Sequence, residues 1–239
     1  MARVKSGIPG FDEIVGGGIP RGSTIAIVGG PGTGKSIFCM QFLYNGAQLF
    51  NEPGIFVSLE ERPAEIKRDM LKFGWNIEKI EEERKLVILD ASASRLGVLS
   101  KDKYALDVGF NLDILCRKLG QVVNELDAKR VAIDSATILK LQMRDEFETR
   151  KAMLRLNNLL IDLGCTSLIT LEMPRQIKDS LEFGLEEYVF RGVIHLFLDD
   201  EVGRTIVVRK MRGTRHATSR YILHIGDKGL EVKPAKIVT

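Results

Sequence analysis

A glycine-rich turn followed by a lysine and a serine gives this chain its clearest chemical signature. The turn, Gly29 to Ser36, reads Gly-Gly-Pro-Gly-Thr-Gly-Lys-Ser and fits the P-loop spacing. Its glycines allow the backbone to wrap a polyphosphate with N–H groups turned inward, and a following helix adds partial positive charge. Lys35 would reach the β- and γ-phosphates, and the Ser36 hydroxyl would ligate Mg²⁺. The other loop residues expected at the phosphates are Gly30, Pro31, Gly32, Thr33 and Gly34.

Glycine-rich loops also match this spacing by chance, so the flanking segments decide. An apolar β-branched run, Ile25 to Val28, precedes the turn, and apolar residues at helical spacing follow it to about residue 50. A strand before and a helix after are the context in which a P-loop binds a nucleotide. We therefore predict a site for a nucleoside triphosphate and Mg²⁺.

Carboxylates follow two of the predicted strands. Asp134 ends the apolar run 131–134, where P-loop proteins hold Mg²⁺ with a second carboxylate; alone, an aspartate at a strand end is a weak signal.

Glu60 and Glu61 follow the apolar run 54–59, and ligands of parallel sheets lie beyond the carboxyl ends of the strands. A carboxylate there can orient the attacking water and accept its proton. Neighbours on an extended chain point to opposite faces, so we expect one of the two to face the water. The alternative is a solvated acidic strand end.

A third group of candidates is basic. The segment Arg209 to His216 carries several cations, and no acidic residue occurs between Thr205 and Gly226. If the predicted strand continues through this segment, Lys210 and Arg212 share a face. Such cations suit charge neutralisation at a phosphate, in the same chain or across a subunit boundary. A solvated basic strand and a nucleic-acid contact are the alternatives.

The order of predicted elements indicates an α/β fold. Strands alternate with helices from residue 25 to residue 171, which requires crossover connections and a mostly parallel sheet flanked by helices. From Gly192 short strands follow one another without a helix, and we expect them to form an antiparallel C-terminal extension. No linker or repeat interrupts residues 1–239, so we expect one domain. The predicted strands are 25–28, 54–59, 86–90, 131–135, 167–171, 193–198, 205–210 and 221–225; the predicted helices are 11–15, 38–50, 63–73, 112–126 and 145–163.

Composition narrows the class of protein. The 239 residues carry a net charge of only +3, with acidic and basic residues mixed, unlike a protein that coats nucleic acid. The three cysteines form no Cys-x-x-Cys pair, and the histidines show no metal-ligand spacing. No run of 18 apolar residues and no signal-peptide core occurs. We expect a cytoplasmic protein with buried free thiols, no membrane contact and no structural metal. Trp75 is most simply a packing residue, although it could border the nucleotide base.

Taken together, these motifs resemble those of the KaiC-like branch of the RecA-type P-loop ATPases, over nearly the full length of the chain. The matching blocks are Ser6–Asp12, Gly16–Gly22, Gly29–Ser36, Phe56–Glu61, Phe73–Trp75, Ile133–Ser135 and Lys210–Thr214.

The resemblance implies a homo-oligomeric ring, usually of six subunits, with ATP between neighbours. It implies that Glu60, with Glu61 beside it, accepts the proton of the hydrolytic water, and that Ile37 joins the phosphate loop. Lys210 and Arg212 match cations offered to the neighbour's γ-phosphate. Other matching positions are Thr214, His216 and Asp227 at that nucleotide, and Thr170 and Glu172 in the sensing element that ends the fifth strand.

The chain also departs from the clock members of that family, which carry two such domains in tandem. The stretch that corresponds to their phosphorylated Ser–Thr pair, Leu181 to Gly192, contains neither Ser nor Thr. We therefore expect Mg-dependent ATP hydrolysis with a regulatory or switch role, an unknown protein partner and no autokinase activity.

Two alternatives remain. A RecA/RadA-like DNA-binding ATPase of recombination or repair is less favoured, because the loop Met173–Phe190 holds two basic residues against four acidic ones. A non-catalytic module that binds nucleotide only to hold a ring or a partner is the other.

Overall fold

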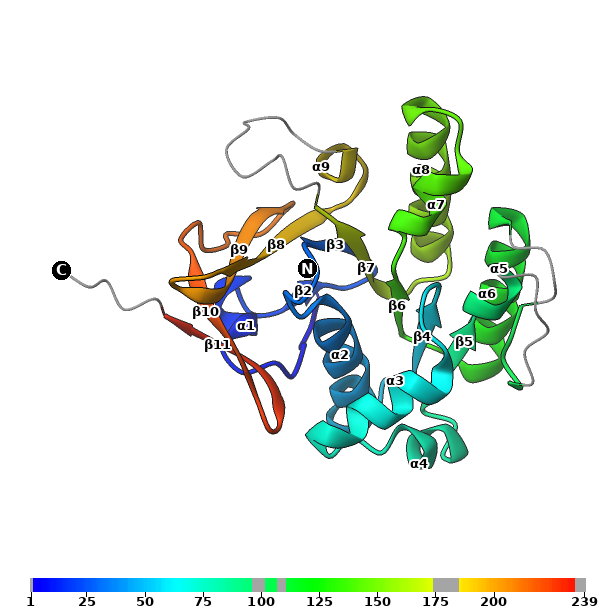
Figure 1. The fold of residues 1–239 in the computed structure, drawn as a ribbon, viewed down its shortest axis with the longest axis horizontal. Helices are drawn as coiled ribbons and strands as arrows, with labels where there is room; N and C mark the ends of the chain where they lie inside the picture. The colour runs from blue at the N-terminus through cyan, green and yellow to red at the C-terminus, as the bar shows by residue number, and fades with distance from the viewer. Residues whose placement is uncertain (1, 96–101, 107–110, 174–184, 235–239) are drawn as a thin grey trace.

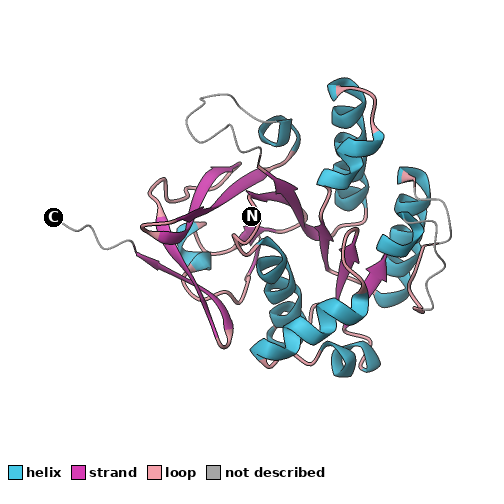
Figure 2. Cartoon of the chain, in the orientation of Figure 1, coloured by secondary structure: helices cyan, strands magenta, loops and turns pink. Residues whose placement is uncertain are grey.

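The chain folds around one nine-stranded sheet with helices on both faces (Figure 1). The structure is a computed structural model that describes residues 2–95, 102–106, 111–173 and 185–234. The strand order is β11-β10-β9-β8-β3-β7-β6-β4-β5. The neighbouring pairs from β8 to β5 are parallel, and those from β8 to β11 are antiparallel. This confirms the predicted α/β fold, with a mostly parallel sheet and an antiparallel C-terminal extension, which Figure 2 shows as the strand-rich side of the molecule.

The bounds of the elements are as follows. The strands are β1 (Arg3–Val4), β2 (Ile19–Pro20), β3 (Thr24–Gly29), β4 (Gly54–Ser58), β5 (Leu86–Asp90), β6 (Arg130–Asp134), β7 (Thr166–Glu172), β8 (Gly192–Asp199), β9 (Gly203–Met211), β10 (Tyr221–Gly226) and β11 (Gly229–Pro234). The helices are α1 (Phe11–Ile14), α2 (Lys35–Leu49), α3 (Pro63–Met70), α4 (Ile77–Glu82), α5 (Ser92–Arg95), α6 (Leu112–Leu126), α7 (Thr137–Gln142), α8 (Glu146–Asp162) and α9 (Leu185–Val189), with a 3₁₀ turn η1 (Leu71–Phe73). Among the residues that the structure describes, no helix is long and apolar enough to cross a membrane.

The structure differs from the sequence-based expectation in a few elements. Strand β8 belongs to the parallel part of the sheet, because it pairs with β3, and the antiparallel extension begins only at β9. Strand β11 and several short elements were not predicted. Of the acidic loop weighed against DNA binding, residues 174–184 lie outside the described residues, and so do residues 96–101 and 107–110 of the polar stretch after β5.

Two apolar clusters hold the sheet from opposite faces. Successive residues of β3 alternate between them: Ile25 and Ile27 face the cluster under α1 to α4, whereas Ala26 and Val28 face the cluster under α6 to α8. A strand buried on both faces reads as a continuous apolar run, which is how the sequence identified β3. The sheet therefore forms a rigid layer whose strand ends carry the polar candidates.

A buried arginine fastens the end of this sheet opposite to the P-loop. Arg130, fully buried at the start of β6, donates to Glu52 Oε2 from Nε at 2.8 Å and from Nη2 at 2.7 Å. It also donates to the carbonyl oxygens of Phe42 at 2.8 Å and Lys5 at 2.9 Å. Burial acts to raise the pKa of Glu52, but hydrogen bonds from Arg21 and Arg130 outweigh it and hold that pKa below its usual value. Arg130 thus ties β6, α2 and the N-terminal segment together.

Glu52→Gln should lower the free energy of unfolding by about 3 kcal/mol at neutral pH, because it leaves the buried guanidinium without its counter-charge. The pKa of Glu52 is depressed in the folded chain, so its contribution is complete above the unfolded pKa and is lost as pH falls through the folded pKa. The gap between variant and wild type in urea unfolding should therefore shrink on acidification. Asp127→Asn removes an exposed pair with Lys129 and is the matched control, expected to change stability little. Equal losses in both variants would contradict this role of Arg130.

Candidate nucleotide-binding site

The P-loop connects the C-terminal end of β3 to the first turn of α2. Gly34 precedes α2 with φ of 101°, a left-handed conformation that favours glycine. No side chain caps α2, whereas Asn111 caps α6 and Asp145 caps α8 through hydrogen bonds to a first-turn N–H. The first amides of α2 therefore remain available to an anion, as the P-loop motif requires. Ser36 is the second residue of α2.

Two polar side chains of the loop donate hydrogen bonds to the backbone of the loop itself. Lys35 Nζ donates to the carbonyl oxygens of Gly29 and Gly30, both at 2.9 Å, so the ammonium group lies over the turn. Thr33 Oγ1 donates to the carbonyl oxygen of Gly30 at 2.8 Å. The side chain of Ile37 packs against the apolar cluster under α1 to α4, and its place at the phosphates stays a prediction.

Asp134 lies at the same edge of the sheet as the P-loop. Thr170 Oγ1 donates to Asp134 Oδ1 at 2.5 Å, which fixes the carboxylate from the neighbouring strand β7. Burial raises the pKa of the Cys39 thiol on α2, the charge of Asp134 raises it further and that of Lys35 lowers it. The carboxylate and the ammonium group therefore act on one buried thiol behind the loop. A carboxylate, a serine hydroxyl and phosphate oxygens are ligands that suit Mg²⁺.

The acidic pair follows β4 at this edge. Strand β4 ends at Ser58, which pairs with Asp134 of β6, and the chain then bends, so strand alternation does not extend to Glu60 and Glu61. Partial desolvation raises the pKa of Glu61, and the negative charges of Asp134, Asp69 and Glu65 raise it further. The carboxylate of Glu61 is thus within electrostatic reach of Asp134. The role of Glu60 stays a prediction.

Arg204, at the other side of the P-loop, was missed by the sequence analysis. It is the second residue of β9, and its Nε donates to the carbonyl oxygen of Gly32 at 2.8 Å. Its strand partner Leu198 also reaches the loop, since a Cβ on Gly32 would lie 3.6 Å from Leu198 Cδ2. No local pattern reveals this contact, because 172 residues separate its partners. The P-loop thus has a cation of its own chain beside it.

The β10–β11 hairpin covers the start of α2. A Cβ on Gly34 would lie 3.4 Å from Ile225 Cδ1, and the turn after Asp227 packs against α2 through Gly229, beside Trp75. Trp75 is buried and stacks on Tyr44, with ring centroids 5.5 Å apart. The packing interpretation of Trp75 therefore fits the structure. Asp227 itself is exposed in the hairpin turn of this chain.

Lys210 and Arg212 lie at the opposite end of the strands from the P-loop. Gly29 of β3 is level with Leu196 of β8, whereas Lys210 pairs with Val193 near the beginning of β8. Arg204 and Lys210 are six residues apart on β9, about 20 Å at roughly 3.3 Å per residue. A lysine side chain cannot span that distance. The cations that the sequence singled out are thus far from the P-loop of their own chain.

The C-terminal end of α9 holds the side chain of Lys210. Its Nζ donates to the carbonyl oxygens of Glu187 and, at 2.9 Å, of Phe190. Desolvation lowers the pKa of Lys210, the charge of Arg212 lowers it further and that of Glu187 raises it. Strand β9 ends at Met211, so Arg212 is not placed on the face of Lys210 by strand alternation; its N–H donates to the Arg191 carbonyl oxygen at 2.9 Å.

The remaining predicted residues fall in two places. Thr214 and His216 lie in the segment after β9, which packs on the turn after α1: Thr214 Oγ1 accepts from Arg3 at 2.8 Å, and His216 Nδ1 lies 2.9 Å from the Ala217 carbonyl oxygen. Glu172 is the last residue of β7 and is level with Gly29 at the start of the P-loop. Its N–H donates to Thr137 Oγ1 at 2.8 Å.

Comparison with known sequences bears on this arrangement. The profile of a family described as "ATPase: KaiC" matches residues 4–237. The chain belongs to the KaiC ATPase family. It is 41% identical to a UPF0273 protein of Methanocaldococcus jannaschii, over 100% of this chain and 99% of the relative. A KaiC-like protein of Pyrococcus horikoshii has a solved structure that matches with a TM-score of 0.82 at 41% identity, over 98% of this chain and 99% of that one.

A longer member of the KaiC family is also similar. The circadian clock oscillator protein KaiC of Parasynechococcus marenigrum is 35% identical over 98% of this chain but only 45% of its own length. The chain therefore corresponds to less than half of that clock protein.

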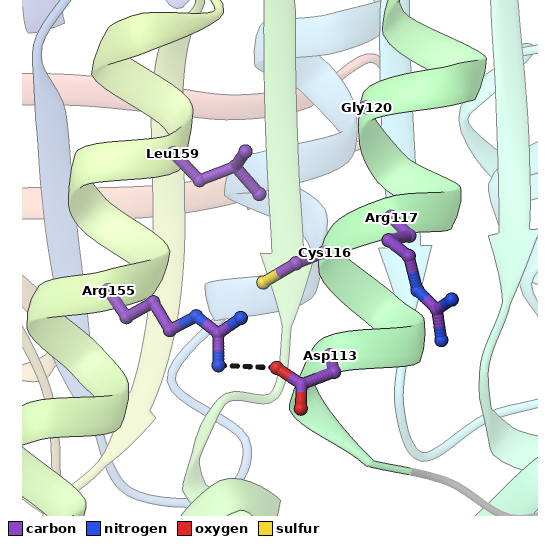
Figure 3. A pocket seen from close by; sticks show the side chains of 6 residues that line it. All are labelled: Asp113, Cys116, Arg117, Gly120, Arg155 and Leu159. Carbon is purple, nitrogen blue, oxygen red and sulfur yellow. Dashed lines mark ion pairs between the residues drawn. The ribbon is translucent and has the colours of Figure 1, made fainter.

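A groove of about 610 Å³ lies elsewhere, between α6 and α8 (Figure 3). Its floor includes Cys116 and Leu159, and an ion pair between Arg155 and Asp113 crosses it. None of the residues predicted for the KaiC-type site lines this groove.

Thr170→Val should weaken the binding of Mg²⁺ together with the nucleotide, so that nucleotide binding needs a Mg²⁺ concentration about tenfold higher or more. The variant keeps the shape of the side chain but removes the hydroxyl that holds Asp134. Thr170→Ser keeps the hydroxyl and should behave as wild type. A Mg²⁺ titration that is unchanged in Thr170→Val would show that this hydrogen bond does not position a metal ligand.

Proposed function

We propose that this protein hydrolyses ATP to ADP and phosphate in a head-to-tail ring, in which each P-loop is completed by Lys210 and Arg212 of an adjoining copy. The observation that carries the proposal is the placement of these cations about 20 Å from Arg204 and the P-loop along β9. A heterologous contact brings the two opposite edges of neighbouring copies together, and it closes into a ring when the rotation permits. Membership of the KaiC ATPase family supports ATP hydrolysis as the activity.

The proposed chemistry assigns one step to each of the predicted groups. A water molecule attacks the γ-phosphorus in line, the new P–O bond forms and the bond to the β–γ bridging oxygen breaks. Glu60 takes the proton of the water, while Lys35 and the amides at the start of α2 hold the phosphate oxygens. Desolvation and then the charges of Asp134, Asp69 and Glu65 raise the pKa of Glu61, and a cation bound near these carboxylates would relieve their mutual repulsion.

Ser36 and Asp134 would hold Mg²⁺, with Thr170 orienting the carboxylate. When bound, Mg²⁺ neutralises charge on the β- and γ-phosphates. Lys210 and Arg212 from the adjoining copy would neutralise the charge that develops on the γ-phosphoryl group, and Thr214, His216 and Asp227 would contact the same nucleotide. Since completion of the site depends on assembly, the enzyme suits slow turnover with a regulatory or switch role.

The cellular setting is part of this proposal. The three cysteines, Cys39, Cys116 and Cys165, are buried and free. Free thiols in each of the three positions suit a reducing cytoplasm.

Glu60→Gln should abolish phosphate release, with a fall of about a thousandfold, while ATP binding persists, because the amide cannot accept the proton of the water. Glu61→Gln is the matched variant: it removes a charge beside Asp134 but leaves Glu60, so hydrolysis should stay within about tenfold of wild type. Phosphate release and nucleotide binding are measured on the same preparations.

The opposite pattern, with hydrolysis lost in Glu61→Gln and kept in Glu60→Gln, would assign the base to Glu61. A wild-type protein that binds ATP and releases no phosphate would contradict the proposed activity and favour a non-catalytic module.

A further inference from the structure

The glycine turn, Gly16 to Gly18, contacts the segment that follows β9. That segment carries three of the residues predicted to contact the nucleotide. We call residues 212–217, which include Arg212, Thr214 and His216, the arm. The glycine turn belongs to the matching block Gly16–Gly22 and takes no part in the proposed chemistry. Two contacts join the turn to the arm, and a third joins the arm to α1 beside the turn.

Arg3 makes the first contact. Its Nη1 lies 3.2 Å from the Val15 carbonyl oxygen, 3.0 Å from that of Gly18 and 2.8 Å from Thr214 Oγ1, so its two hydrogens are shared among three acceptors. Strand β1, which carries Arg3, pairs with β2 on the other side of the turn, at Pro20. One guanidinium group therefore links both ends of the glycine turn to the arm.

Gly16 makes the second contact. It has φ of 71°, and a Cβ built on it would lie 2.7 Å from the Arg215 carbonyl oxygen and 3.1 Å from Thr214 Cγ2. A side chain cannot fit at 2.7 Å from a backbone oxygen, so the arm would have to move. Gly17 also has a positive φ, 102°, but a Cβ there would meet nothing within 4 Å. The turn thus offers a matched pair of glycines.

The third contact holds the far end of the arm. The Ala217 N–H donates to the Ile14 carbonyl oxygen in α1 at 2.8 Å, and at the near end the Arg212 N–H donates to the Arg191 carbonyl oxygen at 2.9 Å. The arm is therefore fixed at both ends and, through Arg3, in its middle. Catalytic groups displaced by about 1 Å can lose on the order of 100-fold in rate.

We propose that Arg3 and Gly16 are positioning residues that set the orientation in which the arm is presented to the nucleotide of the adjoining copy. This inference rests on the proposed function, because the arm acts on another subunit. It predicts a defect that appears in the neighbour's active site and not in the P-loop of the altered chain.

The glycine pair gives the first test, by steady-state ATP hydrolysis. Gly16→Ala should lower kcat by about 10- to 100-fold, because its Cβ displaces the arm, whereas Gly17→Ala should stay within about threefold of wild type. Both variants place alanine at a positive φ, so backbone strain is common to them. Similar losses of kcat in the two variants would assign the effect to strain and overturn the inference.

Arg3 gives a second test, which remains decisive should the Gly16→Ala chain not fold. Arg3→Met should lower kcat, and Arg3→Lys should restore it in part, because a lysine keeps the cation with fewer donors. Arg117→Met, on the exposed face of α6, is the control for loss of a positive charge and should match wild type. Arg3→Met with unchanged kcat would overturn the inference.

Mixed assemblies show in which subunit the defect acts. A Glu60→Gln/Glu61→Gln chain keeps its arm but cannot hydrolyse, and a Gly16→Ala or Arg3→Met chain keeps its own P-loop and carboxylates. In a random one-to-one mixture of heterologous contacts, about a quarter of the sites combine the intact halves. Hydrolysis should therefore rise to about a quarter of the wild-type rate, above the sum of the two separate rates.

A parallel mixture with Lys210→Ala separates a failure of this inference from a failure of the proposed function. Recovery with Lys210→Ala but not with the Arg3 and Gly16 variants would overturn this inference alone. If no mixture recovers, the shared site itself is contradicted, and the proposed function fails with it.

Discussion

The fixed length of one antiparallel strand is the constraint on which the rest of this structure depends. Strand β9 has Arg204 beside the P-loop at one end and Lys210 near the other, about 20 Å away. Strand β9 pairs with β8 along its whole length and with β10 at Thr205 and Ile206, and this pairing keeps its two ends apart. The phosphate loop and the predicted phosphate-neutralising cations of one chain are therefore permanently separated, and a second copy is the simplest way to unite them.

The sheet makes this separation rigid and also gathers the chemistry at one edge. The strands β3, β4, β6 and β7 are parallel and end together, which brings the P-loop, the acidic pair, Asp134 and Thr170 to that edge. Apolar clusters cover both faces, so the polar groups at the strand ends have a fixed base. At the other end of the sheet Arg130 and Glu52 hold the first residues of the chain to β6. The same N-terminal segment includes Arg3 and the glycine turn, and both contact the arm.

The sequence predicted much of this architecture because its signals are local. The bounds of β5 and α6 match the predicted ranges, since each is an apolar run or a periodic pattern with a clear end. Strand β11 and the helices α4 and α7 were missed because they are short and derive their stability from packing on other elements. The parallel pairing of β8 was also missed, because periodicity does not reveal which strand is the neighbour.

The same distinction applies to the site. The P-loop and Asp134 could be identified because their residues form a motif or end a strand. Arg204 contacts Gly32 across 172 residues and Arg3 contacts Thr214 across 211, and neither pair has a local signature. Only the folded chain brings them together, and under the proposed function the completed site requires a further chain.

The most direct test of that central claim is the turnover per chain in Mg-ATP across a dilution series, with particle mass measured in the same samples. If neighbours share each site, turnover per chain should fall as assemblies dissociate into single chains. Constant turnover in samples that contain only single chains would contradict the account.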